Sequence, residues 1–527
     1  MGKQRILQGA IILTASNFIT RLLGFAYRIT MANAIGAEGL GLYQLFMPLY
    51  SLAWCITSAG LTTTLSHLTA RHAGQGHPEN ARRLLHLTFG ISFVLSLPVS
   101  LVLFFGAPSF VNHLLGDCRV LPALRILSFC VPAMAMGSCI RGYFYGCQIH
   151  RVPALSQLLE QVLRLSCLLV VAHFFSLQNE TFAVSAAALS VVLGEVGSCL
   201  FVFLCLRQDK PSSHPATLSY PAALSALLAM AVPLGANRIL SSLFNTAESL
   251  MIPQRLSLFP GSENALADFG RLTGMAMPLL QLPSSFLTAL STALLPAVSH
   301  AAAQKRSAAL QAATGQSILF TLLSSYAAAG VLFLFGDRFC ALIYHDASLS
   351  QFLKPLAFYA PLLYVHITLS GLLNGLALQR FSFLLHTVSS CCTLVLLYIG
   401  LPQIGLAAYF GAMGLSLVLT VSLSAFRLKK EGVLHLSPIH TFFYPALAFV
   451  LAVLVNRLLQ PSLSQNLLGT GISCLVFVLC YGLVLLWTGS IALCLTGKAS
   501  RPNLFARLAR QNQIDFSLDN SNSTKFS

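Results

Sequence analysis

The sequence contains little charge for its length. Only 9% of its 527 residues are Asp, Glu, Lys or Arg, whereas 56% are hydrophobic, and the mean hydropathy is +0.76. An average soluble domain carries roughly 25% charged residues, so the charge here is too sparse to cover a globular surface. This scarcity excludes a soluble fold and predicts an all-α polytopic membrane protein.

Motifs for several chemistries are also missing. The fourteen cysteines include no CxxC pair and lie mostly within apolar stretches, so we expect no disulfide framework. The sequence has no nucleotide-binding P-loop, because Gly497-Lys498 is followed by alanine, and no GxSxG or HExxH motif. The histidines show no spacing typical of metal ligands. We therefore predict no enzyme activity, no cofactor and no metal site.

The positive charge is spread along the chain. The formal net charge is +16, but the basic residues lie between long apolar runs and form no single face, which argues against a nucleic-acid partner. Most of them fall on one side of the expected topology. Because cytoplasmic loops are enriched in Lys and Arg, we expect both termini to be cytoplasmic.

Apolar stretches of about twenty residues predict membrane-spanning helices. We identify fourteen of them in the sequence. They lie at 6–31, 42–69, 84–106, 121–146, 152–175, 181–206, 221–252, 271–300, 310–335, 353–378, 381–401, 404–426, 440–458 and 468–495.

An internal repeat appears when the fourth and tenth predicted helices are aligned. Arg141–Arg151 lies over Ser370–Arg380 at an offset of 229 residues, and Asp117 falls on Asp346 at the same offset. Glycine, proline and arginine positions also match in this register: Gly142 with Gly371, Gly146 with Gly375, Arg151 with Arg380, and Pro132 with Pro361. The repeat therefore predicts two parallel six-helix lobes related by an axis along the membrane normal, followed by two further helices.

The domain boundaries follow from this repeat. The predicted parts are an N-lobe at 1–206, a cytoplasmic linker at 207–220, a C-lobe at 221–427, the last two helices at 440–495 and a polar cytoplasmic tail at 496–527.

Charged residues within the predicted helices are candidates for a central cavity, because such residues normally face a partner or water. Glu160 and Arg164 have the i,i+4 spacing of a helical ion pair, which either neutralises itself or forms a cavity wall. Interhelical pairs such as Arg238 with Glu248, or Arg21 with Glu195, are the alternative for the other charges. The candidate cavity residues are Arg21, Arg28, Arg141, Glu160, Arg164, Arg238 and Glu248. Arginine dominates this set, which suits an anionic ligand.

Five stretches resemble a known family. They are SNFITRLLGFAYRI (16–29), GAEGLGLYQLFMPLY (36–50), GYFYGCQIHRVPALSQLLEQVLR (142–164), LFNTAESLMIPQRL (243–256) and LTGMAMPLLQLPSSFLTALSTALLPAVS (272–299). They are similar to the polysaccharide-transporter branch of the multidrug/oligosaccharidyl-lipid/polysaccharide flippase superfamily, which also contains the lipid II flippases.

The resemblance implies a bacterial plasma-membrane protein that flips or exports a polyprenyl-diphosphate-linked saccharide or a peptidoglycan precursor for cell-wall, spore-cortex or polysaccharide synthesis. Its partners would be this lipid-linked saccharide, membrane lipid and proteins of cell-wall synthesis. Lipid II flippases carry essential arginines on their first helix, which Arg21 and Arg28 resemble, and their last two helices form a groove for the lipid tail. The alternatives are a cation-coupled multidrug exporter and a non-transporting scaffold for cell-wall assembly.

Overall fold

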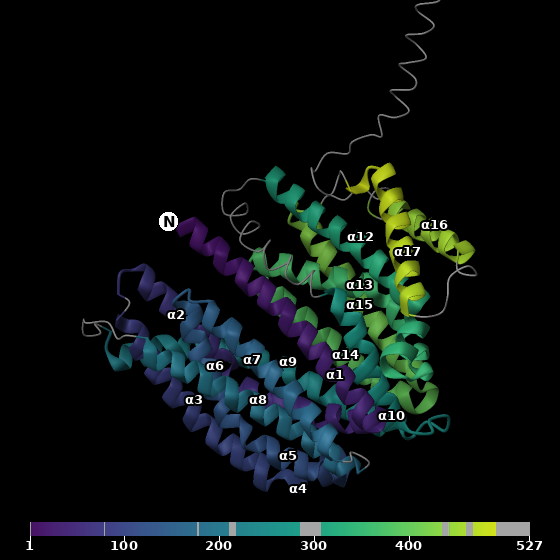
Figure 1. Ribbon diagram of the computed structural model, residues 1–527. Coiled ribbons are helices and arrows are strands. Elements are labelled where there is room, and N and C mark those ends of the chain that lie inside the picture. Colours follow the sequence, from purple (N-terminus) through teal and green to yellow (C-terminus); the bar gives the residue numbers. More distant parts are fainter. Residues whose placement is uncertain are drawn as a thin grey trace, which may run out of the picture. The chain divides into compact units, whose positions relative to one another are not determined.

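A computed structural model describes residues 2–77, 79–175, 179–209, 218–284, 307–434, 441, 443–459 and 467–491. Over these residues the chain is helical and contains no strand (Figure 1). The α-helices are α1 (Gly2–Trp54), α2 (Gly60–Gly74), α3 (Glu79–Phe105), α4 (Ala107–Phe110), α5 (Leu121–Ser128), α6 (Cys130–Gly146), α7 (Arg151–Phe174), α8 (Glu180–Gln208), α9 (Tyr220–Leu256), α10 (Ala265–Phe269), α12 (Ser307–Phe339), α13 (Ser350–Gly375), α14 (Gln379–Ile404), α15 (Leu406–Lys430), α16 (Tyr444–Leu459) and α17 (Leu467–Trp487). Short π-helical turns are η1 (Cys55–Ala59), η2 (Val111–Leu115), η4 (Gly270–Ala276) and η5 (Cys340–Tyr344), and η3 (Cys118–Val120) and η6 (Ala347–Leu349) are 3₁₀ turns.

Ten of the described helical segments are long and apolar enough to cross a membrane, or eleven if the bent pair Cys118–Ser128 and Cys130–Gly146 is one span. The prediction of a polytopic all-α protein is therefore confirmed. The predicted spans 6–31 and 42–69 fall in one helical stretch that is kinked between them at Gly36. The span 271–300 lies largely outside the described residues, and 440–458 corresponds to the shorter α16. The count of fourteen stays a prediction.

A glycine bends the long helix α1. Gly36 has φ 72° and ψ −176°, a backbone conformation that is essentially restricted to glycine because any Cβ would clash. Hydropathy places a break between two spans near this position. The structure has its kink at this glycine, within the predicted gap, with helix on either side of it.

The chain divides into two compact units. The first comprises Met1–Ser285, Ile343–Phe352 and Phe383–Ser416, and the second Phe286–Leu342, Leu353–Ser382 and Leu417–Ser527. These units differ from the predicted lobes, because α9 packs on α1 and α2 inside the first unit. The division groups residues by their contacts and does not follow the sequence repeat, so it does not test the predicted lobe boundaries. These boundaries stay predictions.

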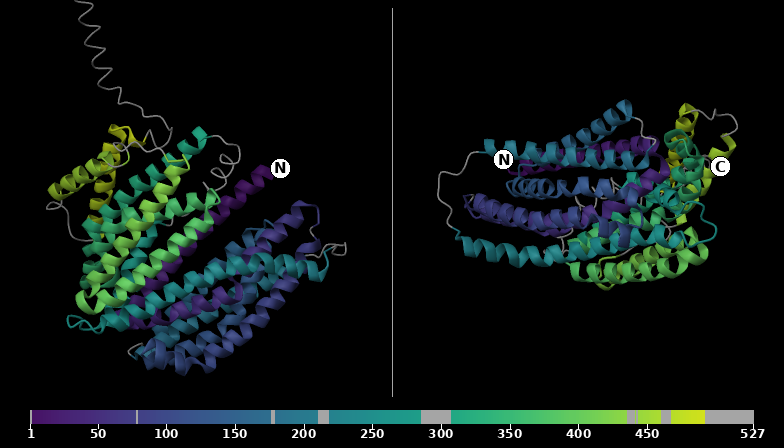
Figure 2. Two further views of the ribbon diagram at one scale, coloured as in Figure 1. Left: turned by 180° about the vertical axis from the view of Figure 1, so that it is seen from behind. Right: turned by 90° about the horizontal axis from the view of Figure 1, so that it is seen from below.

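Each unit has its own apolar core. In the first unit, α3, α6 and α8 pack side by side, as the blue helices of Figures 1 and 2 show, around the fully buried Leu84, Ile140 and Val202. In the second unit, α12, α16 and α17 enclose the fully buried Phe335 and Phe477. The core of the first unit holds α6 and α8, two of the helices that carry the candidate site.

Local backbone features recur at the offset of the predicted repeat. The π-turns η2 and η5 are 229 residues apart, and each leads through a left-handed residue into a 3₁₀ turn. Asp117 accepts a hydrogen bond from the Arg119 N–H at the start of η3, and Asp346 accepts one from the Ser348 N–H at the start of η6. The backbone geometry around these two turns thus agrees with the repeat. The repeat of whole lobes stays a prediction.

Two glycines at repeat-equivalent positions form a close helix crossing in the first unit. A Cβ on Gly41 would lie 2.2 Å from the Leu266 carbonyl oxygen, and a Cβ on Gly270 would lie 2.0 Å from the Ala37 carbonyl oxygen. Both pairs, 41 with 270 and 37 with 266, differ by 229 residues. Gln44 Nε2 also donates to the carbonyl oxygen of its own equivalent, Thr273, at 2.9 Å. The contact therefore has the self-complementary form expected of a twofold relation.

Candidate functional site in the first unit

An ion pair on α7 is the centre of the candidate site. Glu160 and Arg164 lie one turn apart on the same face, and Arg164 Nη2 is 2.6 Å from Glu160 Oε1. Pro153 lies in the first turn of α7, where its missing N–H interrupts no intrahelical bond, so the helix runs unbroken to Phe174. The pairing that the spacing predicts is confirmed.

The same arginine binds a second carboxylate, which belongs to α8. Arg164 Nη2 donates to Glu195 Oε1 at 3.0 Å. The two helices approach closely at Gly194, where a Cβ would lie 2.6 Å from Arg164 Cγ and 2.9 Å from the Glu160 carbonyl oxygen. Glycine at this position provides the space for one guanidinium to reach acids on two helices.

Side chains from α1 and α6 complete the surroundings of Glu195. The Tyr50 hydroxyl donates to Glu195 Oε1 at 3.0 Å, and Arg141 Nη2 lies 3.9 Å from Glu195 Oε2. Arg141 donates its hydrogen bonds elsewhere, to Ser198 at 3.0 Å and Ser138 at 3.2 Å. Four helices therefore meet at Glu195.

We call Arg141, Glu160, Arg164 and Glu195 the charge cluster. Their side chains are 12, 12, 16 and 9% exposed, respectively. An unpaired ionised side chain in a membrane interior costs about 2.5–3.5 kcal/mol or more, and pairing offsets this cost. Two acids balance two arginines, so the cluster as it stands offers no excess positive charge to an anion.

The predicted site omits Glu195. It is one of two acidic residues in α8, and the other, Glu180, lies in the first turn near the helix end. An acid in the middle of an apolar helix is a usable signal for a buried partner. Its partners come from three other helices, however, and helical spacing carries no information about contacts between helices.

Arg238 of α9 lies apart from carboxylates. Its guanidinium is 6.0 Å from the centre of the Trp54 ring, and Nη2 is 3.4 Å from Thr63 Oγ1. The alternative pairing with Glu248 is not observed. Glu248 is half-buried, and its charge acts on the Tyr409 hydroxyl. Arg238 thus has no carboxylate partner among the residues with described side chains.

Two further arginines lie on α1. Arg21 is exposed and Arg28 is half-buried, and their spacing of seven residues places them on one face of the helix. Arg28 acts electrostatically on the Tyr43 hydroxyl. Within the described part of the chain it forms no hydrogen bond or ion pair. The alternative pairing of Arg21 with Glu195 is not observed, since Arg164 and Tyr50 hold that carboxylate.

A second charged network surrounds Arg119, outside the longest apolar segments. Arg119 contacts Glu38 at 2.8 Å, Asp117 at 2.6 Å and the carboxylate of Glu180. Burial raises the pKa of Asp117, but hydrogen bonds from the Arg119 side chain and backbone outweigh the burial and hold the pKa below its usual value. The carboxylate therefore stays ionised at neutral pH and anchors η3.

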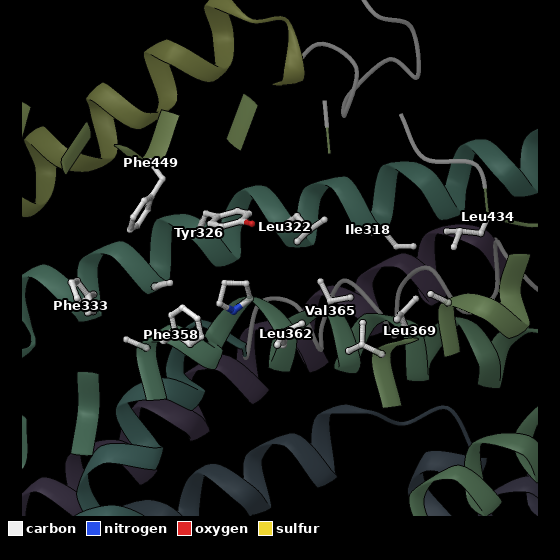
Figure 3. A pocket seen from close by; sticks show the side chains of 15 residues that line it. Ile318, Leu322, Tyr326, Phe333, Phe358, Leu362, Val365, Leu369, Leu434 and Phe449 are labelled. Atoms are coloured by element: carbon white, nitrogen blue, oxygen red, sulfur yellow. The ribbon is translucent and has the colours of Figure 1, made fainter. Parts of the chain in front are cut away.

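The described residues contain no group of three or more His, Cys, Asp or Glu side chains that could hold a metal ion. An apolar pocket of about 490 Å³ lies in the second unit, between α12, α13, α15 and α16 (Figure 3). Phe333, Phe358 and Phe449 contribute to its wall, and Tyr326 supplies the one side-chain hydroxyl among the described residues that line it. Such a pocket suits a hydrocarbon chain and no charged group.

Comparison with known proteins gives matches over most of the chain. The family described as polysaccharide biosynthesis protein matches residues 6–302, and the MatE family matches residues 272–399. Stage V sporulation protein B of Bacillus subtilis (strain 168) is 31% identical over 82% of this chain and 85% of its own length. Lipid II flippase MurJ of the same organism is 25% identical over 78% of this chain and 79% of its own.

Solved structures share the fold. A lipid II flippase MurJ in an inward closed conformation has a TM-score of 0.67 at 14% identity, covering 92% of this chain and 99% of its own. An inward-facing multidrug resistance MATE family transporter of the MOP superfamily has a TM-score of 0.65 at 16% identity, covering 80% and 98%. The chain therefore shares the fold of these two transporters. The chain belongs to the polysaccharide biosynthesis protein family and is a multi-pass bacterial membrane protein.

Proposed function

We propose that this protein is an alternating-access flippase for a polyprenyl-diphosphate-linked saccharide or peptidoglycan precursor. The observation that carries the proposal is the presence of Arg28 and Arg238, two arginines within apolar helices that have no carboxylate partner among the described side chains. A relative named as a lipid II flippase supports the same class of substrate. An uncompensated guanidinium in a membrane protein needs an anion, and a diphosphate matches its fork of donors.

The seven predicted cavity residues then have two roles. Arg28 and Arg238, with Arg21 and Glu248 on the same two helices, contact the head group. Arg141, Glu160 and Arg164 belong to the charge cluster, where arginine is already paired with acid. In this account the cluster holds α6, α7 and α8 together while the arginines of α1 and α9 meet the substrate.

The lipid tail is assigned to the second unit. The resemblance implies a tail groove at the last two helices, whereas the pocket of Figure 3 is bounded by α16 together with α12, α13 and α15. Apart from the Tyr326 hydroxyl, its wall offers a hydrocarbon chain an apolar surface. The tail of a polyprenyl substrate would bind in this pocket.

Alternating access requires a closure that can open. The crossing of Gly41 and Gly270 supplies a closed contact between the helices that follow the predicted first and seventh spans. We place it on the outer face, because the loops on that side contain few basic residues. The two predicted lobes would separate here as they rock about the repeat axis.

The proposed plasma-membrane topology has both termini in the cytoplasm. Cysteines introduced at Gln75 and at Glu263, both exposed, should then lie on opposite faces. In intact cells, a membrane-impermeant maleimide should add label over the parent chain for Glu263→Cys only, and Gln75→Cys should react after permeabilisation. Reaction of both in intact cells would reject the orientation.

Arginine variants test the head-group site. Losing one charge-assisted hydrogen bond costs about 1.5–3 kcal/mol, which is roughly a 10- to 150-fold loss of affinity. We therefore expect Arg28→Ala and Arg238→Ala to lose most of the lipid-linked saccharide that co-purifies with the wild type, measured by native mass spectrometry. Lysine at either position should retain part of it.

Arg207→Ala is the matched control, because Arg207 lies in the last turn of α8 and stacks on Phe203, 5.0 Å from the ring centre. It should bind as the wild type does. Equal lipid occupancy in Arg28→Ala, Arg238→Ala and Arg207→Ala would remove the two arginines from the head-group site.

A further inference from the structure

A tryptophan lies beside Arg238, the arginine of α9 that has no carboxylate partner among the described side chains. Trp54 is the last residue of α1 and is half-buried, whereas Arg238 is exposed. The guanidinium carbon of Arg238 is 6.0 Å from the centre of the Trp54 ring. This distance is at the outer limit of a cation–π contact, so the ring holds the arginine only weakly. An anion that binds the guanidinium can therefore draw it away from the ring.

The backbone of two helices brings these side chains together. A Cβ on Gly60 would lie 2.5 Å from the Ala231 carbonyl oxygen, so α2 and α9 approach closely at this glycine. Arg238 contacts Trp54 and Thr63, which lie on either side of the π turn η1. The nine residues from Trp54 to Thr63 would make about 2.5 turns of regular α-helix and place the two on opposite faces. The wider π turn reduces this rotation, which lets one arginine contact both.

The edge of the Trp54 ring is fixed by α6. Trp54 Nε1 donates to Ser138 Oγ at 3.1 Å, and the same oxygen accepts from Arg141 Nη2 at 3.2 Å. The indole N–H is thus satisfied, and this hydrogen bond orients the ring. What the ring offers to a ligand is its face, which is the negative part of its quadrupole.

A saccharide ring matches such a face. Its C–H bonds form apolar patches with a partial positive charge, which pack on the negative face of an aromatic ring, while its hydroxyl groups stay free for water. In a polyprenyl-diphosphate saccharide, the first sugar is bonded directly to the diphosphate. A diphosphate held by Arg238 therefore brings this sugar next to Trp54.

We propose that Trp54 is the sugar platform of the head-group site, meaning the aromatic face on which the first saccharide ring stacks. When Arg238 binds the diphosphate, its guanidinium leaves the Trp54 ring and the sugar takes its place. This inference rests on the proposed flippase function and narrows the substrate: the site selects a polyprenyl diphosphate that carries a sugar over the same lipid without one.

Equilibrium binding of two probes to the purified full-length protein tests this selection. One probe is a short-chain prenyl diphosphate bearing a single N-acetylhexosamine, and the other is the same prenyl diphosphate without the sugar. We expect Trp54→Leu to weaken binding of the glycosylated probe roughly 2- to 10-fold, the range of one aromatic contact, and to leave the bare probe unchanged. Arg238→Ala should weaken both. Trp487→Leu is the matched control, because Trp487 is the exposed last residue of α17, and it should bind both probes as the wild type does.

Fluorescence gives a second reading that keeps Trp54 in place, in case Trp54→Leu does not fold. The chain contains two tryptophans, so Trp487→Phe makes Trp54 the only one. Its emission should change more with the glycosylated probe than with the bare probe. Equal changes with the two probes would reject the sugar platform.

The binding data separate failure of this inference from failure of the proposed function. If Trp54→Leu weakens both probes equally, the tryptophan only positions Arg238, and the sugar platform is rejected while the flippase proposal stands. If the wild type binds neither probe, both are overturned.

Discussion

Replacing Arg164 with leucine should remove most of the folded protein. The substitution leaves Glu160 and Glu195 buried without the guanidinium that lies 2.6 and 3.0 Å from them. Breaking a buried pair by removing one partner typically costs about 3–5 kcal/mol, and this arginine serves two acids. We expect a large loss of membrane abundance and a much lower unfolding temperature in detergent.

The matched variant is Glu160→Gln/Arg164→Leu, which removes the i,i+4 pair together. It should recover part of the stability, since only Glu195 then lacks its close partner and Tyr50 still donates to it. Arg207→Leu, at the exposed end of α8, should leave abundance unchanged. Wild-type abundance and unfolding temperature in Arg164→Leu would show that the cluster does not hold these helices.

Adding one methyl group at the glycine crossing should open it. In Gly41→Ala and Gly270→Ala the new Cβ atoms would lie 2.2 and 2.0 Å from backbone carbonyl oxygens, which cannot rotate away as a flexible side chain can. Overpacking of this kind costs about 1–3 kcal/mol, which changes the ratio of closed to open molecules roughly 5- to 150-fold. The two variants should behave alike, because the contact is self-complementary.

Hydrogen exchange followed by mass spectrometry measures this opening directly. Peptides covering residues 37–44 and 266–273 should lose protection together in either variant, and transport should fall. Gly90→Ala is the control: nothing lies within 4 Å of its Cβ position, and alanine is the better helix former. Unchanged protection of both peptides in Gly41→Ala and Gly270→Ala would mean that the crossing is not a closure.

The sequence predicts local contacts well and contacts between helices poorly. The pair Glu160–Arg164 follows from spacing within one helix, and the helical class follows from hydropathy. Glu195 joins Arg164 only because Gly194 lets α7 and α8 approach, and no periodicity encodes that approach. The pairing of Arg238 with Glu248 failed for a different reason: both residues lie on α9, and ten residues of helix separate them by about 15 Å along its axis. Arg238 lies instead over the ring of Trp54.

The offset of the sequence repeat predicts local structure at positions where hydropathy gives no signal. Asp117 and Asp346 both start 3₁₀ turns, as their alignment at one offset suggests. Gly41 and Gly270 have the same offset, and the structure brings them into contact with each other's helices. Hydropathy also locates the first break, because the gap between the first two predicted spans contains Gly36, the glycine with positive φ at which α1 is kinked.

Transbilayer movement of lipid-linked saccharide in liposomes tests the central claim most directly. Purified protein is reconstituted with a fluorescent polyprenyl-diphosphate saccharide, and an impermeant quencher reports the fraction facing outward over time. The account predicts protein-dependent movement that Arg28→Ala and Arg238→Ala reduce and Arg207→Ala does not. Movement of cationic drugs alone would indicate a multidrug exporter. No protein-dependent movement of any lipid-linked saccharide would contradict the account and favour a scaffold.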